Sequence, residues 1–254
     1  MSAMTAQKHF YLIRGLIREA AHWGEFLNHL KKNFPEAKVT TIDIPGAGEY
    51  YRSPSPLSIG EMVEQMRQTF KIHSNANEEN ILVAISLGGM ISANWLKNHP
   101  EDFQRCVLIN TSYRDYSGTF ERLKPSALAY LLKVPFLKGR AKEAHILKLV
   151  SNNPDVFETT LDLWVKIQNS RPVSLKNTLR QLMAAAKFKS EGFKPQIPTL
   201  ILASEADRMV SVVCSEKIAK AWNVPIIKHS TGGHDLTADD PQWVVEKINR
   251  LWHP

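Results

Sequence analysis

Three residues whose types can act together in nucleophilic catalysis, Ser86, Asp207 and His234, each follow closely after a short apolar run. A serine hydroxyl is a poor nucleophile until a neighbouring base takes its proton, and that base must itself be oriented by an acid. The three residue types therefore predict acyl transfer in which Ser86 is the nucleophile, His234 the base and Asp207 the orienting acid.

Small residues surround the serine in the stretch Ala84-Ile85-Ser86-Leu87-Gly88-Gly89. A sharp turn from a strand into a helix requires small residues on both sides, because the two backbones nearly touch there. Ala84 stands where the G-x-S-x-G pattern has its first glycine. A serine before a helix is also a common N-cap, so the pentapeptide alone leaves both interpretations open.

Two other carboxylates compete with Asp207 as the orienting acid. Glu205 lies in the same segment, and Asp235 follows the histidine directly. The segment 110–112 follows another apolar run but offers no carboxylate. The remaining histidines fit a catalytic position less well, because most of them fall within predicted strands or helices or near a terminus. They are residues 9, 22, 29, 73, 99, 145, 229 and 253.

The elements that would position these residues alternate between strands and helices. Short, near-continuous apolar runs are typical of buried parallel strands, and strands that alternate with helices predict a sheet covered on both faces. The predicted strands are His9–Ile13, Ala37–Ile42, Asn80–Ile85, Arg105–Ile109, Pro198–Ala203 and Pro225–His229. The predicted helices between them are Ala20–Lys32, Ile59–Lys71, Gly88–Lys97, Ser211–Trp222 and Pro241–Trp252. Ligands bind at the carboxyl ends of such strands, which is where all three candidates fall.

The alternation breaks once, between residues 112 and 196, where only helical patterns occur. They include Ala127–Leu132, Ala144–Val150 and Val156–Gln168, separated by prolines. We expect a core domain of residues 1–111 and 197–254 and an inserted helical cap of residues 112–196. Apolar side chains from Leu128 to Leu137 are expected to form the cap's own core or to line an acyl pocket.

The basic residues are concentrated in this predicted cap. Residues 113–190 hold 14 of the 32 Lys and Arg but 6 of the 25 Asp and Glu, a net charge of +8. A field of one sign attracts opposite charge, so an anionic substrate, an acidic membrane surface and a simply solvated face are all compatible with it. Nucleic acid is disfavoured, because the lysines alternate with apolar residues at helical spacing and no binding signature is present.

With these residues in place, the sequence resembles the α/β-hydrolase superfamily over nearly its whole length outside the cap. In that family a loop after the first core strand supplies one backbone N–H to an oxyanion hole. The matching stretch here is Arg14-Gly15-Leu16, so the resemblance implies oxyanion donors at the amides of Leu16 and Leu87. Arg14 replaces the family's usual histidine, which changes how the loop is braced and adds a cation there.

The resemblance also bears on the number of strands and on a second loop. The stretch 43–48, Asp-Ile-Pro-Gly-Ala-Gly, matches a turn that shapes a loop in the family and is not catalytic. The family usually begins with an extra hairpin, for which about eight residues before His9 leave too little room. We therefore expect an α/β fold with a mostly parallel sheet of about six strands.

Composition limits the class of protein, its location and its metal or cofactor content. With 43% apolar and 22% charged residues, the chain is typical of a globular protein. Its apolar runs are too short to span a bilayer, and its first residues do not resemble a signal peptide, so we expect a cytoplasmic protein without stable membrane insertion. The two cysteines, Cys106 and Cys214, have neither a C-x-x-C partner nor a histidine at zinc-ligand spacing. No metal and no cofactor is indicated.

The sequence thus predicts a serine hydrolase, carboxylesterase-like in its chemistry, that cleaves a carboxylic ester or related acyl compound through an acyl-enzyme. Two alternatives stay open. The same scaffold hosts C–C bond hydrolases, lyases and peroxidase-type enzymes, and a ligand-binding protein could keep the pocket with residual hydrolysis. The basic, apolar cap favours a small-molecule acyl substrate with an apolar chain and an anionic group.

Overall fold

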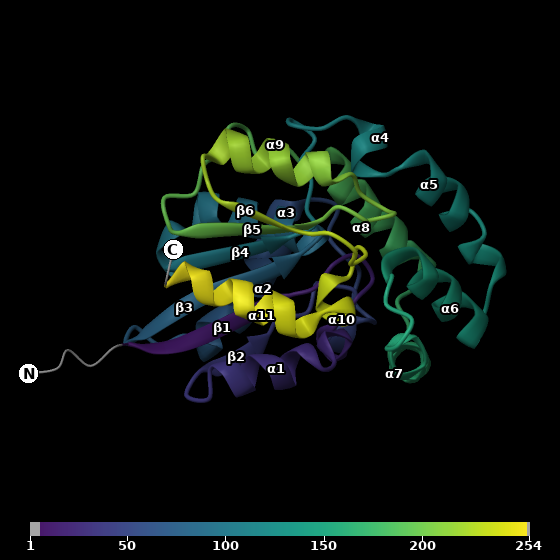
Figure 1. Ribbon diagram of the computed structural model, residues 1–254, viewed down its shortest axis with the longest axis horizontal. Helices are drawn as coiled ribbons and strands as arrows, with labels where there is room; N and C mark the ends of the chain where they lie inside the picture. Colours follow the sequence, from purple (N-terminus) through teal and green to yellow (C-terminus); the bar gives the residue numbers. More distant parts are fainter. Residues whose placement is uncertain (1–5, 253–254) are drawn as a thin grey trace, which may run out of the picture.

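A six-stranded sheet forms the centre of the protein in the computed structural model, which describes residues 6–252. All neighbouring strands run parallel, in the order β2-β1-β3-β4-β5-β6. Their carboxyl ends therefore meet at one edge, toward the inserted helices at the right of Figure 1. The strands are β1 Gln7–Ile13, β2 Lys38–Thr41, β3 Glu78–Ile85, β4 Arg105–Ile109, β5 Thr199–Ser204 and β6 Ile226–His229.

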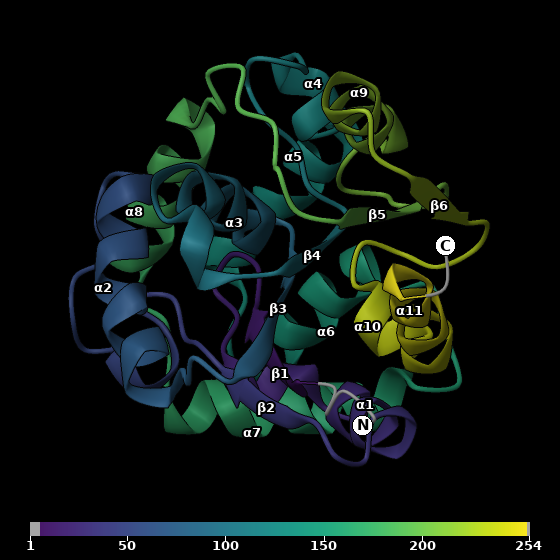
Figure 2. The ribbon, with the colours of Figure 1, turned by 90° about the vertical axis from the view of Figure 1, so that its left-hand side faces the viewer.

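Helices cover both faces of this sheet, as the end-on view shows (Figure 2). Because successive strand side chains point to opposite faces, Tyr11 and Ile13 belong to the apolar cluster that includes α2, α3 and α9, while Phe10 and Leu12 belong to the cluster that includes α1 and α11. All four side chains are fully buried. The covering helices are α1 Phe26–Asn33, α2 Ile59–His73, α3 Leu87–Asn98, α9 Val212–Trp222 and α11 Pro241–Ile248.

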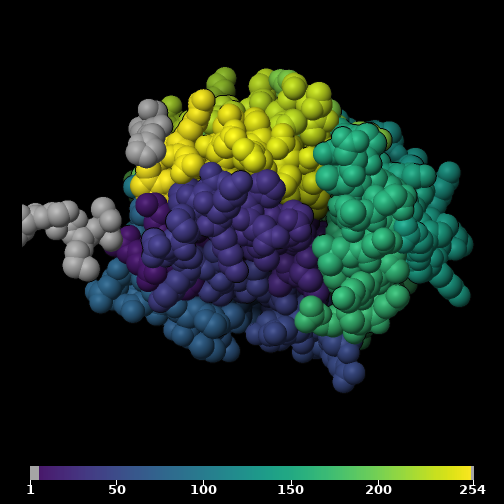
Figure 3. Space-filling model, turned by 60° about the horizontal axis from the view of Figure 1, so that its bottom comes forward, coloured from purple at the N-terminus to yellow at the C-terminus, as the bar shows by residue number. Residues whose placement is uncertain are grey.

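Between β4 and β5 the chain forms five helices and, within the described residues, no strand. We call α4 to α8 the inserted helices. They are α4 Thr119–Arg122, α5 Pro125–Leu131, α6 Gly139–Val150, α7 Phe157–Ser170 and α8 Leu175–Lys187. They gather at one end of the molecule (Figures 1 and 3). Part of them encloses a separate apolar cluster built around Leu147, Leu161 and Trp164.

The predicted strands and the parallel sheet are confirmed, and most strand bounds differ by one or two residues. Three helix predictions were wrong in extent. The helix expected over Ala144–Val150 is the second half of α6, which begins at Gly139. The helix expected over Ala20–Lys32 is a 3₁₀ turn, Ala20–Trp23, followed by α1, and the break lies at Gly24, whose φ of 46° is left-handed. The helix expected to reach Trp252 ends at Ile248 and continues as a 3₁₀ turn.

Two further helices, α10 and α8, were not predicted from the sequence. The four-residue helix α10, Leu236–Asp239, follows the His234 loop. Helix α8 is not among the helices that the periodicity predicted. In the described residues no helix combines the length and apolar character needed to cross a bilayer.

Candidate active site

Ser86 lies on the turn between β3 and α3 and has a φ of 56° and a ψ of −118°. A serine in this region is strained, and such strain persists only where the surroundings fix it. Here the Ser86 amide donates to Ile109 O at 2.9 Å, and Thr111 Oγ1 donates to Ser86 O at 2.8 Å. The serine occupies the N-cap position of α3, but its hydroxyl makes no capping hydrogen bond. The hydroxyl is therefore not used for capping.

Glycines allow the loop after β1 to lie directly against this turn. A Cβ placed on Gly88 would lie 2.6 Å from Ile13 O and 2.7 Å from Arg14 O, and these are backbone atoms. A Cβ on Gly15 would lie 3.1 Å from the Cβ of Ser86. The stretch Arg14-Gly15-Leu16 is thus held beside the serine by close backbone packing.

Asp207 and His234 form a buried hydrogen-bonded pair. The imidazole Nδ1 lies 2.6 Å from Asp207 Oδ2, and both residues are buried. The other carboxylate oxygen accepts from the amides of Met209 and Val210, at 2.7 and 2.9 Å. Because the carboxylate is fixed on both sides, it orients the imidazole.

The protonation of His234 depends on this carboxylate. Burial by itself would lower the pKa of His234, but the charge of Asp207 and the hydrogen bond to it together outweigh burial. The pKa of His234 is therefore raised above its ordinary value.

The two rival carboxylates have other partners. Glu205 is exposed and pairs with Lys228 at 2.9 Å. Asp235 is buried and pairs with Arg14. Among the three candidates, Asp207 is the one hydrogen-bonded to His234.

Asn110 connects the histidine loop to the serine turn, and the sequence analysis did not identify it. Its side-chain amide donates to His234 O at 2.8 Å and to Gly233 O at 3.3 Å, and its Oδ1 accepts from Ser204 N at 2.8 Å. Asn110 follows Ile109, whose carbonyl binds the Ser86 amide. Its position directly after a strand was the available signal, but the search there was for a carboxylate.

Ser86 and His234 thus lie on loops at the same sheet edge, tied through the end of β4. Within residues 6–252 no hydrogen bond joins the serine hydroxyl to the imidazole. Such contacts are often long in the absence of substrate and tighten when it binds. The arrangement brings Asp207 and His234 into contact and places Ser86 on a neighbouring loop.

The two amides expected as oxyanion donors flank the serine. Leu87 is the first residue of α3, where amides have no intrahelical acceptor, and Leu16 follows the glycine that packs on Ser86. In the described part of the chain neither amide donates to a protein acceptor. The next amide, Ile17 N, is held by Gln181 Oε1 at 3.0 Å. Gln181 lies on α8 and is fully buried.

Arg14, which departs from the family pattern, braces the histidine loop. Its guanidinium donates to both carboxylate oxygens of Asp235 and, at 2.8 Å, to the hydroxyl of Thr237. It also lies over the Trp23 ring, 4.9 Å from the centroid. Burial by itself would raise the pKa of Asp235, but the charge of Arg14 and the hydrogen bonds from Arg14 and Thr237 together outweigh burial and hold that pKa below its usual range.

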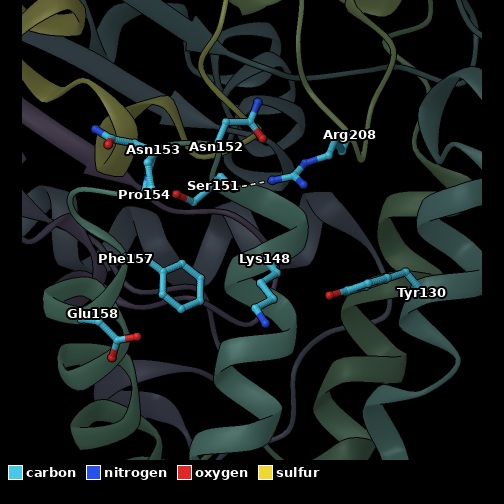
Figure 4. Close-up of a pocket in the computed structure, with 9 residues that line it drawn as sticks. All are labelled: Tyr130, Lys148, Ser151, Asn152, Asn153, Pro154, Phe157, Glu158 and Arg208. Carbon is cyan, nitrogen blue, oxygen red and sulfur yellow. Dashed lines mark hydrogen bonds between the residues drawn. The ribbon is translucent and has the colours of Figure 1, made fainter.

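A pocket of about 520 Å³ lies between the inserted helices and Arg208, the residue after Asp207 (Figure 4). Arg208 donates to Ser151 O at 2.5 Å, and Asn152 Nδ2 donates to Ala206 O and Thr231 O. The segment at the end of α6 therefore braces both the acid loop and the histidine loop. Ser86 and His234 do not line this pocket. Within residues 6–252 no cluster of three His, Cys, Asp or Glu side chains is suited to a metal ion.

The apolar residues of the 128–137 segment divide between two environments. Tyr130, Leu131 and Val134 pack on the apolar cluster of the inserted helices, as expected. Leu128, Leu132 and Phe136, in contrast, are exposed. For these three residues the expectation of a core position was wrong.

Comparison with known proteins gives one family match and many structural matches. The model of the family described as Hydrolase_4, serine aminopeptidase S33, matches residues 5–239. No curated protein matches the chain. Among solved structures, the chain resembles 2-hydroxy-6-oxo-6-phenylhexa-2,4-dienoate hydrolase from Rhodococcus sp. strain RHA1, with a TM-score of 0.77, 16% identity, and coverage of 98% of this chain and 91% of that one.

Two further structures have the same fold. One is a lipase-esterase related protein from Clostridium acetobutylicum ATCC 824, with a TM-score of 0.71, 15% identity, and coverage of 96% and 94% of the two chains. The other is a membrane phospholipase A described as a bacterial virulence factor, with a TM-score of 0.76, 19% identity, and coverage of 97% and 79%. At these identities the likeness establishes the fold and leaves the reaction open.

Proposed function

The chain belongs to the Hydrolase_4 family of α/β-hydrolases, and from this premise we propose that it is a serine hydrolase that cleaves a carboxylic ester or related acyl compound. The observation that carries the proposal is the buried 2.6 Å contact between His234 Nδ1 and Asp207 Oδ2. It lies at the same sheet edge as a serine in strained, left-handed backbone. A purely structural role requires neither the strain nor the oriented imidazole.

In the proposed mechanism, Ser86 Oγ attacks the substrate carbonyl while His234 Nε2 takes the hydroxyl proton. Asp207 accepts a hydrogen bond from Nδ1–H, which fixes the tautomer and stabilises the imidazolium that forms. His234 then gives the proton to the leaving group, and an acyl-enzyme on Ser86 remains. Water, activated by the same imidazole, releases the acid product.

The developing oxyanion would be held by the amides of Leu16 and Leu87. Both flank Ser86, and neither is used by another acceptor in the described residues. Donors that are already fixed stabilise the transition state without reorganisation, and each contributes roughly 10²-fold to 10³-fold in rate. We propose that the inserted helices act as a cap over this site and select the acyl group.

The test combines a fluorophosphonate probe with two substrate series. The proposal expects the probe to label Ser86 and short p-nitrophenyl esters to be hydrolysed faster than aminoacyl p-nitroanilides. Aminopeptidase is the activity that the family's description names, so the anilides address it directly. Absence of labelling in folded protein would contradict the serine assignment, whereas labelling without ester turnover would favour C–C bond hydrolysis or ligand binding.

An anionic group on the substrate is a further part of the proposal, based on the basic inserted helices. Its test compares kcat/KM for neutral and carboxylate-bearing esters of equal chain length. A higher kcat/KM for the carboxylate-bearing esters supports an anionic substrate group, and equal kcat/KM values contradict it.

A further inference from the structure

Helix α8 buries its polar side and exposes its apolar side. Asn177 and Gln181 are 4% and 0% exposed, whereas Leu175 and Leu179 are 65% and 51% exposed. Leu182 and Met183 extend the exposed stripe. A surface helix normally turns its apolar stripe to the core, so this face is arranged for contact with something outside the chain.

The polar side of α8 is fixed inward by hydrogen bonds. Asn177 accepts from Ser55 N at 3.0 Å and donates to Ser53 O at 2.9 Å. Gln181 accepts from Ile17 N and donates to Ser55 Oγ at 3.2 Å. Rotating the helix to bury its leucines would leave these buried polar groups unpaired, which is costly. The exposed orientation is therefore the stable one.

A second exposed apolar stripe lies on α5 and the 3₁₀ turn after it. Leu128, Leu132 and Phe136 are 42%, 65% and 86% exposed, and Ala127 faces the opposite way, fully buried. Both stripes belong to the inserted helices, at the carboxyl end of the sheet (Figure 1). We call them together the apolar end.

The two segments of the chain that carry the apolar stripes are basic. Residues 124–142 contain five basic residues and neither Asp nor Glu. The one acidic residue of α6, Glu143, comes directly after this segment. Residues 171–189 contain five Lys and Arg and no Asp or Glu. In the described residues Lys133, Lys138, Lys176 and Lys187 make no ion pair. Two copies of such a surface repel each other, so a second copy of the chain fits poorly.

We propose that the apolar end docks on the surface of an anionic phospholipid bilayer. The leucines, Phe136 and Met183 enter the boundary between headgroups and acyl chains, while the lysines bind the lipid phosphates, as interfacial amphipathic helices do. This is reversible adsorption and needs no membrane-spanning segment. The proposal is independent of the reaction at Ser86.

Pelleting with vesicles tests the proposal. The full chain is mixed with vesicles of phosphatidylcholine alone or of equimolar phosphatidylcholine and phosphatidylglycerol. We expect it to sediment with the mixed vesicles, to stay in solution with the neutral ones, and to be released by salt, because salt screens the lipid charge. Replacing Leu175, Leu179 and Met183 together by Gln, or Lys133 and Lys138 together by Glu, should weaken binding by roughly an order of magnitude.

Matched controls distinguish the loss of vesicle binding caused at the apolar end from an effect of surface polarity or charge in general. Ile72→Gln removes an apolar side chain that is 79% exposed on α2, and Lys31→Glu with Lys32→Glu reverses charges on α1. Both controls should sediment like the unchanged chain. The thermal midpoint, measured for every variant, establishes that each is folded.

Failure of the unchanged chain to bind mixed vesicles would overturn the proposal. So would undiminished binding by both apolar-end variants. The chain could instead form dimers that the Gln substitutions on α8 convert to monomers, while neither the unchanged chain nor any variant binds vesicles. In that case a second copy of the chain covers the apolar end, and the proposal is wrong.

Discussion

The guanidinium of Arg14 forms a buried ion pair with the carboxylate of Asp235, the residue directly after His234. Arg14 also begins the loop whose glycine packs on Ser86. One ion pair between side chains therefore connects the expected oxyanion loop to the histidine loop.

Arg14→Met should strongly destabilise the fold, because it leaves Asp235 buried without a counter-charge. The expected loss in the free energy of unfolding is about 3–5 kcal/mol, measured by urea denaturation at neutral pH. Adding Asp235→Leu should recover most of it, since no buried charge then remains. Arg140→Met, which breaks exposed ion pairs with Glu158 and Asp162, serves as the control and should change little. Equal losses for the single and double variants would contradict this account.

Ser86→Ala should abolish turnover while leaving the fold intact. By analogy with the removal of other catalytic nucleophiles, kcat should fall by about 10³-fold to 10⁶-fold, measured with p-nitrophenyl esters. Fluorophosphonate labelling should disappear as well. Ser74→Ala, at the end of α2, is the matched serine control and should retain both. A Ser86→Ala protein that keeps most of its rate would remove Ser86 from the mechanism.

The pH profile should report the raised pKa of His234. The imidazole must be neutral to accept a proton, so kcat/KM falls as the pH drops through its pKa. Because Asp207 raises that pKa, the acid limb should lie above the ordinary value of 6.5. Asp207→Asn removes the charge, so the limb should move to lower pH and the rate should fall. An acid limb unchanged in Asp207→Asn would indicate that a different group titrates.

The sequence predicted the centre of the sheet well because the inner strands β1, β3, β4 and β5 are buried on both faces. Phe10 and Leu12 are buried on one face of the sheet, and Tyr11 and Ile13 are buried on the other. The apolar run in the sequence is therefore continuous and easily recognised. The same parallel topology places every residue after a strand at one edge, which is why Asp207 and His234, far apart in sequence, could be paired in advance.

What the sequence did not predict depends on contacts between distant segments. The partner of Arg14 is 221 residues away, and no local pattern indicates that pairing. Helix α8 has apolar residues at helical spacing, Leu175, Leu179 and Leu182, so its periodicity was available in the sequence. That pattern predicts a buried apolar side, however, and the contacts with distant segments bury the polar side instead. Asn110 was overlooked because its role lies in hydrogen bonds to backbone atoms of another loop.

Asn110→Ala should slow catalysis more than it weakens substrate binding. The change removes hydrogen bonds to Gly233 O, His234 O and Ser204 N, which fix the histidine loop. A displaced imidazole lowers kcat, by roughly 10²-fold for a shift of about 1 Å, while KM should stay within a few fold. Asn98→Ala, at an exposed helix end, is the matched control. A rise in KM with unchanged kcat would argue against a positioning role for Asn110.

Gly88→Ala should disrupt the packing between the serine turn and the loop after β1. The new Cβ would lie 2.6 Å from Ile13 O and 2.7 Å from Arg14 O, and because both are backbone atoms, the loop must move as a whole. That movement shifts Leu16 relative to Leu87, so we expect kcat to fall by about 10²-fold or more, with a lower thermal midpoint.

Gly60→Ala provides the comparison, because the nearest atom to its Cβ is Asn94 Oδ1 at 3.7 Å, an ordinary contact in the first turn of α2. Alanine there should stabilise the helix by about 0.5–1 kcal/mol and leave kcat unchanged. If Gly88→Ala instead folds and turns over like the unchanged chain, the loop after β1 does not need this close approach, and the assignment of the Leu16 amide as an oxyanion donor loses its geometric basis.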